Sequence, residues 1–520
     1  MQSRRDQVQA HMFVMGRLTS SMLRADPDAP ESPQGRTNRG VVIGVVIAVL
    51  LSAGAFVLGM LKPGAKDSWQ EPGTLVVDKA TGSRYLYLDG RLRPVRNYAS
   101  ARLLAGADMT VATVGAGSLS GTPHGAPVGI TGAPDVLPGG AELDDGPWQV
   151  CSGTATGSTG TTLAVGVPAD AAGLPTTQAL LVTGPDKADY LVWRGSKLRL
   201  DRDTGAREAL GYGSTPRVAV SAAFLNSVPS GPDLTPAEVP GLGAQGPALG
   251  GRSTRIGEVF RVTVPGSAER YYLLRREGLA PLTATGAALL LGAPDVREKV
   301  YEGRAAQVRT LGADALSGHL APGADTSAQD TDRPAAPPRI VGVEDGRTAC
   351  VRVQPGGKGP RISVALVAAA DLGPAAQAPP EGLTPACVPV GRITVAPGGG
   401  DLVRVLGASG SAVGGTLYLV TDTGMKYRVG SAQALTALGY AQGQARGLPA
   451  PLLAMLPTGP DLTPEAAALG TSTTTAPRCG TGGAGAAADG QAAGAPAAEP
   501  RGTGAARTVG GPDGAEADGG

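Results

Sequence analysis

The sequence predicts an α+β protein with an N-terminal amphipathic helix, a single transmembrane helix and an extracytoplasmic domain of four small α/β repeats around a central β-rich domain. Residues 41–61 form an uncharged apolar run, and four later stretches share one pattern of strand, turn, strand, turn and short helix. The loop "PSGPDLTP" at 229–236 returns as "PTGPDLTP" at 457–464, and "ALGY" precedes both copies at the same interval of 228 residues. The chain therefore contains two related halves.

Composition and charge exclude one class of partner. The chain has 520 residues, with 45 basic and 44 acidic side chains and a formal net charge of +1. Because there is no run of lysine and arginine either, we expect no binding to nucleic acid. The 80 glycines, 44 prolines and only 3% aromatic residues predict a loop-rich fold.

The apolar run at 41–61 is long enough to cross a bilayer as a helix, and it is bracketed by Arg39 and Lys62. A cleaved signal peptide is the competing interpretation, because "AGA" at 53–55 resembles a cleavage site. The polar segment of 40 residues before the run argues against it. We expect a transmembrane helix at 41–61.

Positive charges close to the span nearly balance, so they do not settle its orientation. The N-terminal tail is short, however, and all six of its arginines count, whereas charges on a long translocated domain count little. Every cysteine follows the span, as expected if that side is oxidising: Cys151, Cys350, Cys387 and Cys479. We expect residues 1–40 in the cytoplasm and the rest outside the cell membrane.

The N-terminal tail predicts an amphipathic helix of about 20 residues. Val8, Met12, Met15 and Met22, joined by Leu18 or Thr19, recur at spacings of three and four, and Asp26-Pro27 would end the helix. Its apolar face could lie on the inner membrane surface, dock on a cytoplasmic partner or pack on another copy of the chain.

The domain boundaries follow from the repeated pattern, in which each repeat ends near a glycine suited to a helix C-cap. We expect repeats 1 to 4 at 73–106, 178–246, 257–292 and 415–470, two parts of a central domain at 107–177 and 293–414, and a disordered Ala/Gly-rich tail at 471–520.

The two "GPDLTP" loops predict structural turns. Pro232 and Pro460 preset the backbone, and Asp233 and Asp461 can accept hydrogen bonds from nearby amides. The "LTPAE" and "LTPEA" stretches that follow predict helices with threonine as N-cap and proline at the first helical position. We assign neither aspartate a catalytic role.

The cysteines offer a disulfide framework. The segments "DDGPWQVCSG" at 144–153 and "EDGRTACVRV" at 344–353 resemble each other and suggest paired strands of the central domain. Their likeness favours a bridge between Cys151 and Cys350, which leaves Cys387 with Cys479. Four cysteines nevertheless allow three connectivities.

Enzyme motifs are scarce. The sequence has no phosphate-binding loop, no HExxH and no GxSxG. The GxGxxG match at 241–246 follows a proline-rich loop in place of a strand, and the match at 480–485 lies in the low-complexity tail. The three histidines, His11, His124 and His319, lack metal-ligand spacing, and the Asp144-Asp145 pair belongs to a turn. We therefore expect no catalytic residue, cofactor or metal site.

Together, "RRDQVQAHMFVMGRL", the single span, the stretch "GTLVVDKATGSRYLYLDGRLRPVRNYASARLL" and the "GPDLTP" loops resemble EccB, the membrane component of type VII (ESX) secretion systems. The resemblance runs from residue 2 to about 470. It implies an elongated extracytoplasmic domain in which four repeats surround a central domain with pseudo-twofold symmetry, held by a disulfide at the position of Cys151 and Cys350. The Cys387 and Cys479 pair and the tail depart from the simplest family pattern.

The resemblance also implies a function. A protein of this family would be a structural core subunit of the membrane complex, with EccC, EccD, EccE and the mycosin protease as partners, self-association, and export of WXG100-type proteins. Members are described as ATPases, so an ATPase with a non-standard nucleotide site is one alternative. A cell-wall anchor that stacks sugars on aromatic residues such as Tyr87 and Trp193 is another.

Overall fold

The computed structural model describes residues 4–24, 33–61, 68–140, 143, 146–152, 160–168, 171–263, 269–323, 331–356, 359–374, 383–407, 410–477 and 479. By internal contacts the chain divides into residues 1–477 and residues 478–520. Of the predicted tail, only 471–477 and Cys479 fall within the described residues. The predicted turn at Asp144-Asp145 and the helix stop at Asp26-Pro27 lie outside them.

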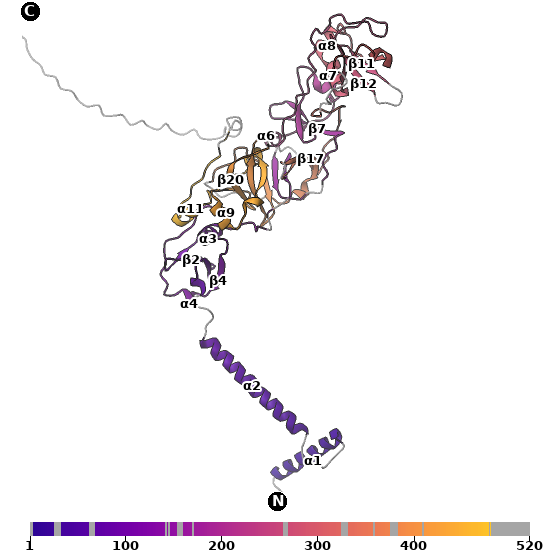
Figure 1. Ribbon diagram of the computed structural model, residues 1–520. Coiled ribbons are helices and arrows are strands. Elements are labelled where there is room, and N and C mark those ends of the chain that lie inside the picture. The colour runs from indigo at the N-terminus through magenta and orange to yellow at the C-terminus, as the bar shows by residue number, and fades with distance from the viewer. Residues whose placement is uncertain are drawn as a thin grey trace, which may run out of the picture. The chain divides into compact units, whose positions relative to one another are not determined.

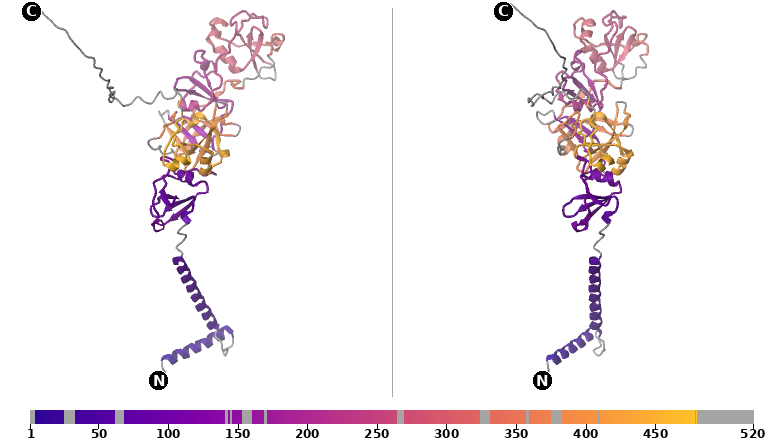
Figure 2. Two further views of the ribbon diagram at one scale, coloured as in Figure 1. Left: turned by 60° about the vertical axis from the view of Figure 1, so that its left-hand side comes forward. Right: turned by 90° about the vertical axis from the view of Figure 1, so that its left-hand side faces the viewer.

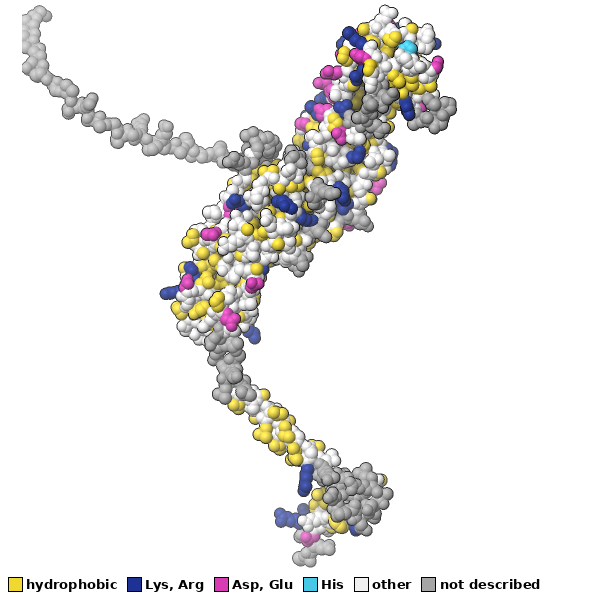
Figure 3. All heavy atoms as spheres, viewed as in Figure 1, with side chains coloured by type: hydrophobic (Ala, Val, Ile, Leu, Met, Phe, Trp, Pro, Cys, Tyr) yellow, Lys and Arg dark blue, Asp and Glu magenta, His cyan; other side chains and the backbone are white. Residues whose placement is uncertain are grey.

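Two helices open the chain. Helix α1 covers Arg4–Arg24, and α2 covers Pro33–Leu61, so α2 begins before the apolar run. Within α2, the stretch Thr37–Val57 is long and apolar enough to cross a membrane, and none of it is buried in the protein. Hydrophobic side chains cover this stretch in Figure 3. An apolar surface of this length requires a non-aqueous environment.

All four repeats share one sheet topology. Three successive strands pair antiparallel, and a fourth returns beside the first in parallel after a helical crossover. The strands of repeats 1 and 2 are β1 Thr74–Asp78, β2 Arg84–Leu88, β3 Arg91–Pro94, β4 Thr110–Val114, β7 Gln178–Thr183, β8 Asp189–Trp193, β9 Ser196–Arg199 and β10 Val218–Ala219. Those of repeats 3 and 4 are β11 Val259–Val262, β12 Arg270–Arg275, β13 Gly278–Leu282, β14 Arg309–Leu311, β19 Gly400–Leu406, β20 Ala412–Thr421, β21 Lys426–Val429 and β22 Arg446–Pro449.

Because of this topology, the repeats begin and end at other residues than the sequence predicted. Repeat 1 extends past residue 106 to include β4, and repeat 3 extends past residue 292 to include β14, because these strands pair with β1 and β11. Repeat 4 begins at β19, one strand earlier than residue 415. The short strand β15, Arg339–Ile340, lies in the predicted central domain but pairs with β7 of repeat 2. A parallel partner brought in by a crossover leaves no local sequence signal.

The crossover helices are α3 Tyr98–Ala105, α5 Ala206–Ala209, α7 Ala284–Gly292 followed by α8 Pro294–Lys299, and α9 Ala432–Leu438. Asn97, Thr283 and Ser431 cap α3, α7 and α9 by accepting hydrogen bonds from backbone amides. Gly106 and Gly439 end their helices at φ 93° and 92°. Repeat 3 departs from the prediction, because α7 runs through Gly292.

The remaining short elements are 3-10 turns and helices that cover the sheets: η1 Ser68–Gln70, α4 Ala116–Leu119, α6 Ala222–Asn226, η2 Ala313–Leu316, η4 Ala369–Leu372, η5 Gln442–Gln444, α10 Ala450–Leu453 and α11 Pro464–Leu469.

Every repeat has an edge loop that pairs with its third strand, although the "GPDLTP" sequence occurs in only two of these loops. In repeats 2 and 4 the loop runs parallel to the third strand. The amide of Gly231 donates to the carbonyl of Lys197, and the amide of Gly459 donates to the carbonyl of Lys426. Repeats 1 and 3 form the same bonds with the dissimilar segments 123–128 and 319–321. The loop therefore pairs an edge that would otherwise expose its backbone groups.

The central domain is one sheet in the strand order β17-β16-β5-β6-β18. Its strands are β5 Trp148–Ser152, β6 Thr161–Val165, β16 Arg347–Gln354, β17 Arg361–Ala368 and β18 Arg392–Val395. Strands β5 and β16 pair antiparallel with Cys151 opposite Cys350, and each continues into a hairpin on its outer side. A twofold operation between the two cysteines thus relates the β5–β6 hairpin to the β16–β17 hairpin, and β18 is added beside β6 only.

The largest hydrophobic core joins this sheet to repeats 2 and 4. It contains Trp148, Phe224 and Val403 from the central sheet, α6 and β19 respectively. Repeats 1 and 3 attach through helices, with α3 against α9 and α11 and with α5 against α7. Figures 1 and 2 show repeat 4 beside repeat 1, although these are the last and the first repeats in the sequence. The two helix contacts correspond under the same twofold operation.

A pair of glycine substitutions tests the contact between repeat 2 and the central sheet. Gly90 and Gly195 occupy equivalent two-residue hairpin turns at φ 71° and 76°. A Cβ at Gly195 would lie 2.4 Å from the carbonyl oxygen of Ile362 on β17, whereas Gly90 has nothing within 4 Å. We expect Gly90→Ala to lower the free energy of unfolding by about 1–2 kcal/mol through backbone strain alone.

Gly195→Ala should add a further loss of about 1–3 kcal/mol from the collision. Urea unfolding of the two full-length variants, followed by tryptophan fluorescence, measures the difference. Equal losses would contradict the close approach of repeat 2 to β17.

Candidate functional site

The residues predicted for the repeated loops occupy two different environments. Asp233 is exposed, and the hydrogen bond that the structure gives at this residue is from Arg333 to its backbone carbonyl at 2.9 Å. Asp461 is buried, and its carboxylate accepts from Arg428 at 3.1 Å and from the amide and hydroxyl of Thr475. Pro460 is buried as well, whereas Pro232 is half-buried. Asp461 therefore fixes the chain that follows repeat 4.

This contact corrects the predicted start of the tail. Thr473 also accepts a hydrogen bond from the amide of Asp461, at 2.8 Å. Residues 471–477 are thus bonded to repeat 4, and the predicted boundary at residue 471 is too early.

The two loops also end differently. Thr463 caps α11 as predicted, by accepting from the amide of Ala466, with Pro464 in the first turn. Thr235 caps no helix, and its hydroxyl instead donates to Asp201 at 3.1 Å. The sequence "LTPAEVP" places Pro240 where the second helical turn would need an amide donor, so a helix cannot continue there. Pro240 was therefore the residue in the sequence that could have predicted the absence of a helix after Thr235.

A buried ionic network that the sequence did not reveal joins repeat 4 to the central sheet. Asp401 on β19 is 1% exposed; it accepts two hydrogen bonds from Arg446 on β22 and one, at 2.8 Å, from the indole nitrogen of Trp148 on β5. Paired donors of this kind are what a buried carboxylate requires.

Two lysines, Lys426 buried and Lys197 half-buried, occupy equivalent places in repeats 4 and 2. Lys197 donates to the carbonyl of Leu225 at the end of α6, and Lys426 donates to the carbonyls of Leu453 and Leu456 after α10. A cation at a helix C-terminus satisfies otherwise unpaired carbonyls. Burial lowers the pKa of Lys197 and lowers the pKa of Lys426 to about 8.

The twin "ALGY" motifs serve the same purpose in both halves. Tyr212 donates its hydroxyl to the carbonyl of Pro338 at 2.8 Å, and Tyr440 donates to the carbonyl of Pro138 at 2.6 Å. Burial raises the pKa of both phenols. Each tyrosine thus fastens its repeat to a segment of chain from the other half.

The structure bridges Cys151 and Cys350 across β5 and β16. Cys387 and Cys479 are disulfide-bonded as well, and no cysteine within the described residues is a free thiol.

The fold does not bring the three histidines together into a catalytic or metal site. His11 lies on α1, His124 in the edge loop of repeat 1 and His319 in that of repeat 3. Within the described ranges no three His, Cys, Asp or Glu side chains are grouped to hold a metal ion. In the GxGxxG match, Gly243, Ala244 and Gly246 donate their amides to carbonyls of the chain itself. The match at 480–485 lies outside the described residues.

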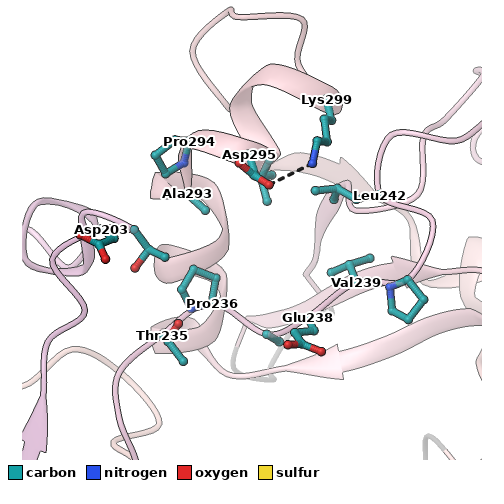
Figure 4. Close-up of a pocket in the computed structure, with 14 residues that line it drawn as sticks. Asp203, Thr235, Pro236, Glu238, Val239, Leu242, Ala293, Pro294, Asp295 and Lys299 are labelled. Atoms are coloured by element: carbon teal, nitrogen blue, oxygen red, sulfur yellow. Dashed lines mark hydrogen bonds and ion pairs between the residues drawn. The ribbon is translucent and has the colours of Figure 1, made fainter.

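A hollow of about 500 Å³ lies between repeats 2 and 3, as Figure 4 shows. The segment 235–242 forms one wall, and α8 forms the other. Asp203 stands at the edge, and Lys299 is bonded to Asp295 at 2.9 Å. The carboxylates here are exposed, so the hollow offers a binding surface in place of an acid–base pair.

Comparison with known proteins gives consistent matches. The family described as "Type VII secretion system ESX-1, transport TM domain B" matches residues 1–476. The chain is 30% identical over 485 residues to the protein named "ESX-3 secretion system ATPase EccB3" of Mycolicibacterium smegmatis, covering 88% of this chain and 89% of that one. It is 31% identical over 297 residues to "ESX-1 secretion system ATPase EccB1" of Mycobacterium tuberculosis, covering 55% and 60%.

Solved structures share the fold. A chain of an intact ESX-5 inner membrane complex is similar over 92% of this chain and 98% of its own length, with a TM-score of 0.59 and 22% identity. An EccB3 dimer from the ESX-3 core complex is similar over 76% and 99%, with a TM-score of 0.57 and 26% identity.

Asp401→Asn tests the buried network. The change leaves the partly buried guanidinium of Arg446 without its counter-charge, so we expect a loss of about 3–5 kcal/mol in the free energy of unfolding. Asp135→Asn is the matched control, because its ion pair with Arg84 is exposed on both sides and should contribute under about 1 kcal/mol. Urea unfolding compares the two; similar small losses would show that the network does not hold repeat 4 in place.

Lys426 makes stability depend on pH. Between its folded pKa of about 8 and the ordinary lysine value near 10.5, the unfolded chain binds a proton that the folded chain does not. The free energy of unfolding should therefore rise with pH across this window, by on the order of 2–3 kcal/mol from this residue.

Thermal unfolding of the full-length protein between pH 7 and pH 10.5 measures this slope. Lys426→Met should remove that part of the rise, whereas Lys299→Met, at an exposed position, should retain it. An unchanged slope in Lys426→Met would contradict the assignment.

Proposed function

The chain belongs to the EccB family of type VII secretion systems, and from this premise we propose that it is a structural core subunit of the secretion complex in the inner membrane, needed for export of WXG100-type proteins across the cell envelope. The observation that carries the proposal is the match along almost the whole chain, from α1 through the membrane helix to repeat 4. A protein with this order of parts can link a channel in the membrane to an assembly beyond it.

We propose that α1 lies in the cytoplasm and the repeats lie on the far side of the membrane. Two observations support this orientation: the arginines of the short N-terminal segment, and the disulfide between Cys151 and Cys350 after the membrane helix. Two similar structures, the periplasmic assembly of an ESX-5 inner membrane complex and an EccB3 dimer from the ESX-3 core complex, are consistent with it and with self-association.

The proposed partners are EccC, EccD, EccE and the mycosin protease. Helix α1 supplies the surface on the cytoplasmic side, because Val8, Met12 and Met15 are each more than half exposed. An apolar stripe on a helix is stable in water only when something covers it. We propose that the membrane complex covers it.

The names of the relatives include an ATPase activity, which is the main alternative. No phosphate-binding loop occurs in the sequence. In the GxGxxG match at 241–246, which lies within the described residues, the amides of Gly243, Ala244 and Gly246 donate to backbone carbonyls of the chain itself. The cell-wall alternative depended partly on Trp193. That side chain is 7% exposed and its indole donates to the carbonyl of Thr176, so it is part of the core.

A charged variant of α1 tests the proposed function. Met12→Glu together with Met15→Glu places two carboxylates on the apolar stripe. Ala10→Glu together with Ser21→Glu adds the same charge on the opposite side of the helix. We expect the first variant to lose most of the EccC, EccD and EccE that co-purifies from native membranes in mild detergent, and to lose export.

The control variant should retain both. Mass spectrometry of the purified complex and immunodetection of WXG100 proteins in the culture medium supply the two readouts. If the stripe variant assembles and exports normally, α1 is not the docking element. If the wild-type protein purifies alone, the structural role in the complex is contradicted.

A further inference from the structure

One edge of the repeat 1 sheet is open. Strand β4 pairs with β1 and stands last in the strand order of this sheet (Figure 1). Its side chains are exposed at Thr110, Val111 and Thr113, and Val111 is 57% exposed. The sequence has no charged residue between Asp108 and Asp135. An exposed, uncharged strand edge is a template for pairing with another strand.

The equivalent edges of the other three repeats are protected. In repeat 2, β10 has only two residues and follows Pro216 and Arg217. In repeat 3, β14 has three residues and begins with Arg309. In repeat 4, β22 contains Arg446, ends at Pro449 and leads directly into α10. Short length, charge and proline keep an edge from pairing. Strand β4 has five residues and neither charge nor proline, so it is the exception among the four.

The backbone groups on the open edge belong to Val111 and Thr113. The amide of Thr110 points toward β1, because it donates at 3.1 Å to the carbonyl of Gly73, the residue before that strand. Successive residues of a strand direct their backbone groups to opposite sides, so those of Val111 and Thr113 point away from β1. Among the described residues, no strand pairs with β4 on that side. Each copy of the chain therefore presents two amides and two carbonyls there.

These groups match those of a second β4 strand in antiparallel orientation. When Ala112 lies opposite its own counterpart, Val111 of each copy faces Thr113 of the other, and each of these pairs exchanges two hydrogen bonds. All the outward backbone groups are then satisfied. The small side chain of Ala112 lies at the axis, and valine and threonine suit a sheet. The edge is thus self-complementary, as a twofold dimer requires.

The membrane helix keeps β4 close to the bilayer. Residues 62–67 connect Leu61, where α2 ends, to Ser68, where η1 begins, and a connection of this length spans at most about 25 Å. Repeat 1 of every copy in one membrane is therefore held near the same surface. A pair of short strands is weak by itself, so confinement to one plane matters, because it raises the effective concentration of one β4 near another.

We propose that β4 pairs antiparallel with β4 of a second copy of this chain in the same membrane, which joins two repeat 1 sheets into one. The occupant is a second copy because every copy carries the same self-complementary edge within the same reach of the bilayer. This inference deepens the self-association proposed above, and it rests on the proposed function in one respect: both copies must share one membrane.

Cysteine cross-linking of the full-length protein in native membranes tests the register. Ala112→Cys places two thiols opposite each other in a non-hydrogen-bonded pair, where Cα atoms lie about 4.5 Å apart and a disulfide can form. Thr110→Cys is the matched control. Its side chain is more exposed, but its counterpart lies four residues away along the pair, more than about 13 Å. On oxidation with copper phenanthroline, we expect Ala112→Cys to form a covalent homodimer at least roughly tenfold faster than Thr110→Cys.

Charges on the open edge should prevent the cross-link. Val111→Lys with Thr113→Lys, added to Ala112→Cys, places lysines on both copies along the proposed contact, and we expect most of the homodimer to be lost. Ser411→Lys with Val413→Lys is the matched control, because these residues have the same spacing, are exposed and lie in a hairpin of repeat 4. This control should retain the homodimer.

Equal rates for Ala112→Cys and Thr110→Cys would overturn the proposal, and so would an equal loss in both lysine variants or a cross-link from Ala112→Cys to a different protein. Co-purification of EccC, EccD and EccE reports the proposed function separately. If these proteins co-purify and no homodimer forms, the pairing of β4 is contradicted and the secretion role stands. If the homodimer forms without them, the secretion role is contradicted and the pairing stands.

Discussion

The antiparallel pairing of β5 with β16 is the contact on which the rest of the fold depends. These strands come from different halves of the chain, and their register places Cys151 opposite Cys350. Each strand continues outward into a hairpin, so the central sheet exists only when both halves contribute. The large core that joins this sheet to repeats 2 and 4 follows from that pairing, and repeats 1 and 3 attach to those two in turn.

Polar groups determine which surfaces meet, while apolar burial supplies most of the stabilisation. Tyr212 and Tyr440 each donate to a carbonyl from the other half of the chain, and Lys197 and Lys426 close the ends of α6 and α10. A buried donor without its acceptor is costly, so each pair favours one arrangement over competing ones. The network of Asp401, Arg446 and Trp148 adds the same constraint in repeat 4 alone.

The sequence predicted what local pattern encodes. The membrane helix, the hairpins and the cap at Thr463 all leave signals within a few positions. It did not predict the fourth strand of each repeat, because that strand pairs with residues brought near only by the crossover. The first strand of repeat 4 was missed for a different reason: Asp401 and Arg404 make it look polar, and the partner of Asp401 lies on a distant strand.

Of two candidate binding surfaces, one could be predicted from the sequence and the other could not. The apolar stripe of α1 is readable from its periodicity, whereas the hollow between repeats 2 and 3 depends on two segments that the fold brings together. Only Pro240 hinted that a helix would be missing there. The edge loops of repeats 1 and 3 share the backbone bonds of the "GPDLTP" loops without their sequence, so comparison of sequences alone could not reveal them.

Disulfide mapping of the full-length protein tests the central claim most directly. Digestion without reduction, followed by mass spectrometry, should yield a peptide pair that links Cys151 to Cys350, because their strands are held in register. A link from Cys151 to either Cys387 or Cys479 would contradict the pairing of β5 with β16, and with it the twofold arrangement of the repeats.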